Sequence, residues 1–496
     1  MLPSQPKSRR RGGERSRSGC KSCKARHIKC DETRPNCRRC LIKGQVCGGY
    51  STTIGVQQVG YSSLVSQITA YAIPFRIPGS QQDRRLFHYF CVRGADDLTG
   101  HLTSDFWTRL VLQYSHDHIS VRQALVALSC AHQYYTTTED ITGSASTEAT
   151  VNYSRAMRSL RKYMSAGIDQ QSVSTLVPLI CSVIFFSFEN MQGNTESALR
   201  HLDSGIAILA HQREADSTSP NNRDHEEICL LEQMLTRLDL QASMFDDARL
   251  PLLRPTLRLE SEVSAYQAFE SLGNAQAELI GLQSGMLRFL MINNTFKFWS
   301  EHNLPDDVKL EKQAIEVAYT EWSRKFDQLL HAQSSRVRET LQDPAITILR
   351  IHYLTFRLLL SHSFPHDPAV FSGPSKSTSH HTLNEILDLI ESITRARGAG
   401  SRSVGAEAGI IPPLFLVIAK CTDHAIFKRA LDLLLSMSGS REGMFNSRVI
   451  AEIAMHFASQ HQTPPGPVAL EWQATDVFEE RVNGLTGVAR NLGIVP

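Results

Sequence analysis

The sequence predicts a mainly α-helical protein in three parts: a small cysteine-rich module, a flexible linker and a large all-α domain. Three observations predict this organisation. Six of the eleven cysteines lie between Cys20 and Cys47. A polar stretch at 48–83, containing Gly, Ser and Gln, follows them without sustained heptads. From Arg84 to the end (84–496), apolar residues recur with helical spacing and strand-like alternation is scarce.

The length and charge of the chain set the first limits on function. At 496 residues it has room for about three domains, and 42% hydrophobic residues are enough to bury a core. The net charge of +2 hides an asymmetry. Residues 1–50 carry 14 Lys or Arg and 3 Asp or Glu, whereas the remainder carries 38 Lys or Arg and 47 Asp or Glu. A basic head on a mildly acidic body indicates that the head binds a polyanion.

The sequence contains no predicted targeting leader or membrane span. The N-terminus lacks the apolar stretch of a secretory signal. The longest apolar run, Leu176–Phe188, includes Pro178 and falls short of the roughly 20 residues that cross a bilayer. We therefore expect a soluble intracellular protein without a membrane partner, in a reducing compartment that disfavours disulfides.

The first 19 residues, rich in Arg, Ser, Gly and Pro, predict a disordered basic tail. Its basic run allows two interpretations. It is either a solvated tail or a nuclear import signal combined with an arm along the DNA backbone. The cysteine module that follows directly favours the second interpretation.

The cysteine module contains two copies of the pattern C-x2-C-x6-C. The first copy is Cys20, Cys23 and Cys30, and the second is Cys37, Cys40 and Cys47. Zinc binds four thiolate or imidazole ligands in a tetrahedron, so one zinc would leave two thiols idle. Two zincs fit six thiolates only if two of them bridge both metals, one from each copy. So short a segment has too little apolar surface to fold alone, and zinc binding must supply most of its folding free energy.

The stretch GCKSCKARHIKCDETRPNCRRCLIKGQVCGGY resembles the fungal Zn(2)-Cys(6) binuclear-cluster transcription factors along its whole length. This resemblance implies two Zn(II) ions, with Cys20 and Cys37 as the bridging ligands. Pro35 matches the proline that usually precedes the fourth cysteine. In this family the first short helix docks in the major groove and reads a CGG-type triplet.

The same resemblance implies a set of DNA contacts. They are Lys24, Arg26, His27 and Lys29 in the first half, and Arg38, Arg39 and Lys43 in the second. Arg26 and His27 match base-reading positions, and Lys29 matches a phosphate contact. The cations of the second half are expected at phosphates, or else as solvated charge. Family members usually have Lys or Arg at the position of His27. His27 either donates a hydrogen bond to a guanine, or makes no contact with the bases while backbone groups read them.

The large region shows helical periodicity throughout. Clear amphipathic segments are Val121–Tyr135, Ala198–Leu209 and Ile426–Leu434. Ser120 with Gln123 predicts a capping box, and Asn194 predicts an N-cap. Loops are expected at 214–224, 364–381 and 398–409.

Parts of this region resemble the fungal-specific transcription factor domain, which implies a regulatory helical domain for effector sensing or partner contact. The stretches are Arg84–Phe90, Ser104–Gln113, Phe188–Leu209, Arg237–Phe245, Ile411–Met437 and Arg441–Ala454. The large region contains no GxSxG, HExxH or phosphate-binding glycine motif. Four histidines, His362, His366, His380 and His381, are expected in an exposed loop. Its five cysteines, Cys91, Cys130, Cys181, Cys229 and Cys421, are expected as small buried hydrophobes.

Together these features predict a nuclear, zinc-dependent, sequence-specific regulator of RNA polymerase II genes, and not an enzyme. The expected partners are double-stranded DNA and the transcription machinery or co-regulators. Monomeric binding and a homodimer through the large domain both stay open. The alternative function is a zinc-cluster module that docks proteins without sequence-specific DNA binding, and an enzyme with an appended zinc module is a distant third.

Overall fold

The computed structural model divides the chain into two compact units, Met1–Tyr71 and Ala72–Pro496. Each unit is described by itself. The residues that the structure describes are 19–33, 36–48, 77–100, 105–137, 147–166, 174–218, 225–246, 249–253, 268–296, 299–333, 343–363, 378–397, 402–421, 423–437 and 439–460.

The described part of the first unit contains two five-residue helices, α1 (Lys21–Ala25) and α2 (Arg38–Ile42). Its buried cluster consists of cysteines alone, and the large aliphatic side chains of α2, Leu41 and Ile42, point to solvent. The described part of this unit therefore lacks an ordinary hydrophobic core. This is the composition expected of a fold that depends on a metal.

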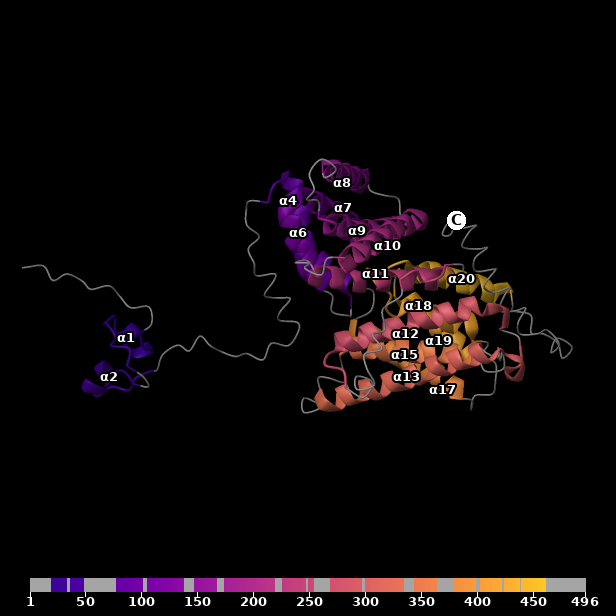
Figure 1. Cartoon of the computed structure of the whole chain (residues 1–496). Helices are drawn as coiled ribbons and strands as arrows, with labels where there is room; N and C mark the ends of the chain where they lie inside the picture. The colour runs from indigo at the N-terminus through magenta and orange to yellow at the C-terminus, as the bar shows by residue number, and fades with distance from the viewer. Residues whose placement is uncertain are drawn as a thin grey trace, which may run out of the picture. The chain divides into compact units, whose positions relative to one another are not determined.

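The described part of the second unit is mainly helical (Figure 1). Its elements are α4 (Gln81–Tyr89), η1 (Phe90–Gly94), α5 (Ala95–Thr99), η2 (Phe106–Leu110), α6 (Val111–Asp117), α7 (Ile119–Thr137), α8 (Thr147–Ala166), α9 (Leu176–Gln192), α10 (Thr195–Thr218), α11 (His225–Phe245), α12 (Leu272–Ile292), η4 (Asn294–Phe296), η5 (Glu301–Asn303), α13 (Asp306–Gln333), α15 (Pro344–Ser363), α17 (Thr378–Arg397), β1 (Val404–Gly405), α18 (Ile411–Lys420), α19 (His424–Ser436), β2 (Arg441–Glu442), β3 (Phe445–Asn446) and α20 (Ser447–Gln460). The prediction of a mainly α protein with a cysteine module is confirmed.

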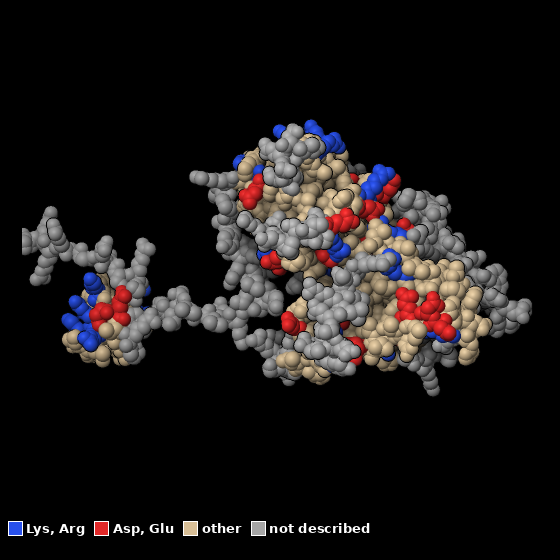
Figure 2. All heavy atoms as spheres, in the orientation of Figure 1, with Lys and Arg blue, Asp and Glu red and all other residues tan. Residues whose placement is uncertain are grey.

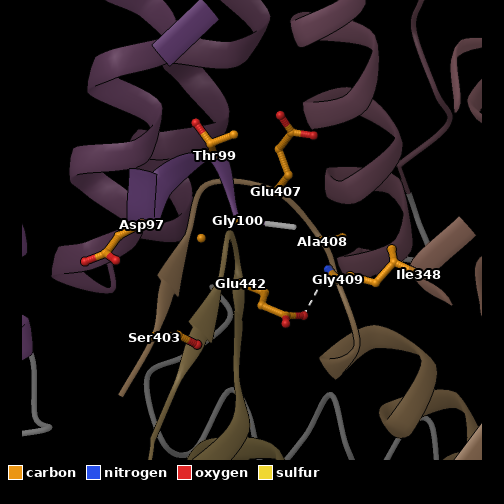
Figure 3. A pocket seen from close by; sticks show the side chains of 10 residues that line it. Asp97, Thr99, Gly100, Ile348, Ser403, Glu407, Ala408, Gly409 and Glu442 are labelled. Atoms are coloured by element: carbon orange, nitrogen blue, oxygen red, sulfur yellow. Dashed lines mark hydrogen bonds between the residues drawn. The ribbon is translucent and has the colours of Figure 1, made fainter. Parts of the chain in front are cut away.

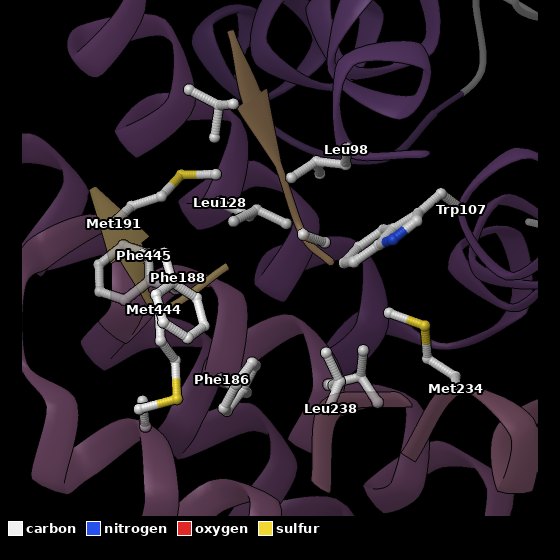
Figure 4. Close-up of a cluster of buried hydrophobic side chains, with 14 of the residues drawn as sticks. Leu98, Trp107, Leu128, Phe186, Phe188, Met191, Met234, Leu238, Met444 and Phe445 are labelled. Atoms are coloured by element: carbon white, nitrogen blue, oxygen red, sulfur yellow. The ribbon is translucent and has the colours of Figure 1, made fainter. Parts of the chain in front are cut away.

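Helix α9 forms the centre of the larger core. Nearly all of its residues are buried, and it packs against α7, α10 and α11. Figure 4 shows Phe186 and Phe188 from this helix among Trp107, Leu238 and Phe445, which come from distant parts of the chain. The apolar run in α9 is core, as predicted. Among the described residues, none of the helices combines the length and the apolar character needed to cross a bilayer.

A second core lies between α12, α13 and α15. The ring of Trp322 stacks on Phe326 and on Tyr353, with centroids 4.7 and 5.3 Å apart. The indole N–H of Trp322 donates to the carbonyl oxygen of Ala275 at 2.8 Å. These contacts satisfy the polar atom of a fully buried tryptophan and fix α13 against α12.

A small three-stranded sheet interrupts the helical pattern. Strand β1 pairs in parallel with β2, which pairs antiparallel with β3. The β2–β3 turn places Gly443 at a positive φ of 55°, and a Cβ there would meet the Gln241 side chain at 2.0 Å. Only glycine fits this close approach. Strands of two residues are too short to show alternation, so sequence patterning predicted a loop at 398–409.

Two predicted details of the helices differ from the structure. The capping box at Ser120 is wrong, because α7 begins one residue earlier at Ile119 and the Ser120 hydroxyl is buried without a hydrogen-bond partner. Asn194 directly precedes α10 as predicted, but its side-chain amide donates to Glu189 at 2.8 Å. Tertiary contacts thus decide how these polar side chains are used.

Helices also extend into two predicted loops. Helix α10 continues to Thr218, and α17 begins at Thr378. His380 in α17 is buried, which contradicts the exposed loop expected for it. Cys130, Cys181 and Cys421 are buried as predicted, whereas the other two cysteines of this unit are half-buried.

The domain boundaries stay predictions. Helix α4 starts at Gln81, earlier than the boundary at Arg84, because Ser80 and Asp83 form a capping box. The basic run of residues 1–18, most of the linker, Pro35 and His366 lie outside the described residues.

Candidate metal centre

The two copies of the cysteine pattern fold in the same way. Cys20 is the N-cap of α1, and its Sγ accepts a hydrogen bond from the Cys23 N–H at 3.4 Å. Cys37 is the N-cap of α2 and accepts from Cys40 in the same way at 3.4 Å. Backbone N–H groups aimed at sulfur favour the thiolate form, which is the metal-binding form.

The six sulfurs form two overlapping groups of four. Cys20, Cys23, Cys30 and Cys37 make one group, and Cys20, Cys37, Cys40 and Cys47 the other, with all sulfurs of a group within 4.8 Å of one another. Cys20 and Cys37 belong to both groups. Their sulfurs lie 3.7 Å apart, close to the edge of about 3.8 Å of a tetrahedron with Zn–S bonds of about 2.3 Å.

The chemistry of these thiols also fits a metal. Burial raises the pKa of Cys20 to about 12 and raises the pKa values of Cys23 and Cys37 as well. Burial disfavours the thiolate form, and a bound cation offsets this cost. The site therefore has the geometry and the electrostatic need for two divalent metal ions.

Asp31 and Ser22 join the two halves of the module. The Asp31 carboxylate accepts from the backbone N–H groups of Arg38 at 2.9 Å and Arg39 at 3.1 Å, and so caps the N-terminus of α2. Its pKa lies below the usual range because the Thr33 hydroxyl and these N–H groups donate to it. The Ser22 hydroxyl donates to the carbonyl of Val46 at 3.1 Å. Sequence reasoning missed both contacts.

The cationic side chains that are predicted to contact DNA lie close together on the module. Figure 2 shows Lys and Arg side chains over much of its visible face, beside a small acidic group. Asp31 and Glu32 are the acidic residues of the described module. The exposed members of the predicted set are Lys24, His27, Lys29, Arg38, Arg39 and Lys43. The structure thus brings these predicted residues together on one small unit.

Arg26 is the exception. It is half-buried, and its Nη2 donates to Cys40 Sγ at 3.1 Å. Its side chain therefore contacts the sulfur cluster, although the sequence predicts it to read bases.

Helix α1 is short. It ends at Ala25, and His27 has a positive φ of 55°. The matching residue of the second half is Gly44, with φ of 62°. A left-handed residue after a short helix turns the chain back, and here it returns towards Cys30 and Cys47. His27 therefore lies beyond the end of α1.

A cavity of the larger unit lies near the sheet (Figure 3). It measures about 30 Å³, which is room for about two water molecules. Glu442 points to the loop after β1, and its carboxylate accepts from the N–H groups of Gly409 at 2.9 Å and Ile411 at 2.8 Å. The cavity is too small for a metabolite, and Glu442 serves to hold the loop.

Six cysteine sulfurs in two groups of four with two shared members suit a binuclear zinc centre, and comparison with known families agrees. Residues 18–55 match the fungal Zn(2)-Cys(6) binuclear cluster domain. Residues 85–453 match the fungal specific transcription factor domain. The chain belongs to this family of fungal zinc-cluster transcription regulators, and its cofactor is two Zn(II) ions.

Curated relatives support the same family. The aspercryptin biosynthesis cluster-specific transcription regulator atnN of Emericella nidulans is 25% identical over 76% of this chain. The match covers 64% of that relative, so the chain spans less than two thirds of its length. The transcription regulator lscL of Purpureocillium lilacinum is 23% identical over 78% of this chain and 95% of its own length. No solved structure matches the chain significantly.

Proposed function

We propose that this protein is a nuclear regulator that binds specific double-stranded DNA sites and reads a CGG-type triplet in the major groove. The observation that best supports this proposal is the pair of four-sulfur groups that share Cys20 and Cys37. Exposed cations of the same module surround these groups. The six cysteines are the proposed zinc ligands, and the two shared ones are the proposed bridging ligands.

The proposed DNA contacts divide by chemistry. Lys24, His27 and Lys29 follow one another along the first half and are the candidates for base edges and nearby phosphates. The cations of the second half, Arg38, Arg39 and Lys43, are the candidates for phosphates. Arg26 remains a predicted contact by position, but its contact with Cys40 supports a different role.

The test is selection of preferred sites from random duplex by the full-length, zinc-loaded protein. We expect enrichment of CGG-type triplets, and the number of triplets per site will distinguish a monomer from a homodimer. Duplex binding should disappear when a chelator removes zinc. Absence of any enriched sequence from a protein that holds two zinc ions per chain would contradict the proposal.

Nuclear localisation and action on RNA polymerase II genes are part of the proposal. The basic run of the first 18 residues supports nuclear import. A fluorescent fusion should concentrate in nuclei, and neutralising the arginines of this run should reduce that concentration. Co-regulators are the proposed partners of the helical unit.

One observation supports the alternative of a protein-docking module. Leu41, Ile42 and Val46 of the second half are 62%, 83% and 90% exposed. Exposed apolar side chains on so small a unit favour contact with another protein. Two bound zincs together with no duplex affinity would favour this alternative.

A further inference from the structure

All three guanidinium nitrogens of Arg26 have partners within the module. Nε donates to the carbonyl oxygen of Ser22 at 3.0 Å. Nη2 donates to Cys40 Sγ at 3.1 Å and lies 4.0 Å from Cys23 Sγ. Nη1 donates to Oε1 of Gln45. A bidentate contact with a guanine would need two of these nitrogens, and would therefore break bonds that hold the side chain in place.

These contacts join the two halves of the module. Arg26 follows α1 in the first half, whereas Cys40 and Gln45 belong to the second. The planar guanidinium suits this task because it presents several donors in a fixed geometry. The side chain thus fixes the end of the first half against the sulfurs of the second.

Charge favours the same placement. Two zinc dications and six thiolates leave a net negative charge on the cluster. Hydrogen bonds from a cation to an anionic acceptor are about twice as strong as those between neutral groups. The Arg26 guanidinium therefore stabilises the Cys40 thiolate by both charge and hydrogen bonding.

The repeat provides a natural comparison for Arg26. The two halves are related by a shift of 17 residues, the separation of Cys20 and Cys37, which makes Lys43 the counterpart of Arg26. Lys43 is exposed, and within the described module it makes no hydrogen bond to a sulfur. Only one of the two equivalent positions contacts the cluster.

We propose that Arg26 is a positioning residue for the zinc cluster, which secures the Cys40 thiolate and joins the two halves, and that it does not read a base. This inference rests on the zinc ligand set proposed above. It leaves the exposed residues Lys24, His27 and Lys29 as the candidates in the first half for base edges and nearby phosphates.

The first experiment measures zinc release from the full-length protein to a chromogenic chelator. Arg26→Gln should release zinc at least about tenfold faster, because a hydrogen bond to a charged group is lost. Lys43→Gln removes one charge at the counterpart position and should change the rate by less than about twofold, since an exposed charge contributes little. Equal rates for the two variants would overturn the proposal.

Two further readouts separate positioning from base reading. Arg26→Lys keeps the charge but not the three-nitrogen fork, so its release rate should fall between wild type and Arg26→Gln. At matched zinc occupancy, Arg26→Gln should keep the base preference of the wild type. Relaxed preference at one triplet position, with unchanged zinc release, would overturn the inference. Absence of any base preference in the wild type would refute the proposed function and leave the zinc-release comparison valid.

A further measurement uses the wild-type protein and so does not depend on whether a variant folds. In protein labelled with 15N-arginine, the Nη protons of Arg26 should give separate, slowly exchanging signals, because Cys40 and Gln45 restrict rotation of the guanidinium. Addition of a CGG-containing duplex should leave these signals in place. A single averaged Arg26 signal in the free protein would overturn the proposal.

Discussion

The two halves of the cysteine module share a backbone but differ in surface. Each begins with a cysteine that caps a five-residue helix, and each then reverses at a residue with positive φ. The first helix carries Lys24 where the second carries Leu41, and the reversal uses His27 where the second uses Gly44. The metal requirement explains what the halves have in common. The metal requirement does not explain the differences, which the proposed contact of the first half with DNA would account for.

The largest expected effect concerns the shared cysteines. Cys37→Ser removes a ligand from both four-sulfur groups, so the protein should lose both zinc ions. Cys47→Ser alters one group only and should retain about one zinc per chain. Metal analysis of the purified full-length variants measures this directly. Cys181→Ser, in the core of the helical unit, is the control and should keep two. Equal zinc contents for Cys37→Ser and Cys47→Ser would contradict the shared-ligand assignment.

The next effect concerns the equivalent positions Lys24 and Leu41. Lys24→Gln should weaken binding to a selected duplex by roughly tenfold and lower the slope of log affinity against log salt by about 0.9, because one cationic contact is lost. Leu41→Gln should leave both quantities unchanged. Fluorescence anisotropy at several salt concentrations measures them. If Leu41→Gln alone weakened duplex binding, the assignment of base reading to the first half would be wrong.

A smaller effect concerns the two reversals. Gly44→Ala forces a Cβ into the left-handed region, which costs about 1 kcal/mol. His27→Gly removes the same penalty and should stabilise zinc binding by about 1 kcal/mol. Competition with a chelator in the full-length protein gives the free energy of zinc binding for both. Opposite signs are expected, and the same sign for both variants would show that side-chain contacts outweigh backbone strain here.

The smallest effect concerns the His27 side chain. His27→Arg adds a positive charge beside the base-reading positions and should tighten binding to a CGG-containing duplex by a few-fold at constant salt. His and Arg both carry a Cβ and so meet the same left-handed strain, which makes zinc affinity the control. Unchanged duplex affinity would show that the side chain at position 27 does not contribute to DNA binding.

Local patterns predicted the parts of this protein that depend on spacing. Two copies of C-x2-C-x6-C were enough to predict two metals and six ligands, because the coordination number of zinc limits the solutions. The apolar run in α9 likewise predicted buried core. The placement of Arg26 could not be predicted in this way. Its partners Cys40 and Gln45 lie 14 and 19 residues away, and only the folded module brings them together.

The helical unit also has features that local sequence patterns could not predict. Amphipathic spacing predicted its helices, but the small sheet depends on pairing between Val404 and Arg441, which are far apart in sequence. The predicted capping box failed because Ser120 is buried against the core. Contacts between distant segments, which spacing does not encode, decided both outcomes.

We propose that the zinc module reads a DNA sequence. The most direct test compares the affinity of the full-length, zinc-loaded protein for a CGG-containing duplex with its affinity for one of equal length and scrambled triplet. At physiological salt we expect a preference of about a thousandfold for the CGG duplex, together with a steep fall in affinity as salt rises. Equal affinity for the two duplexes at every salt concentration would contradict the claim.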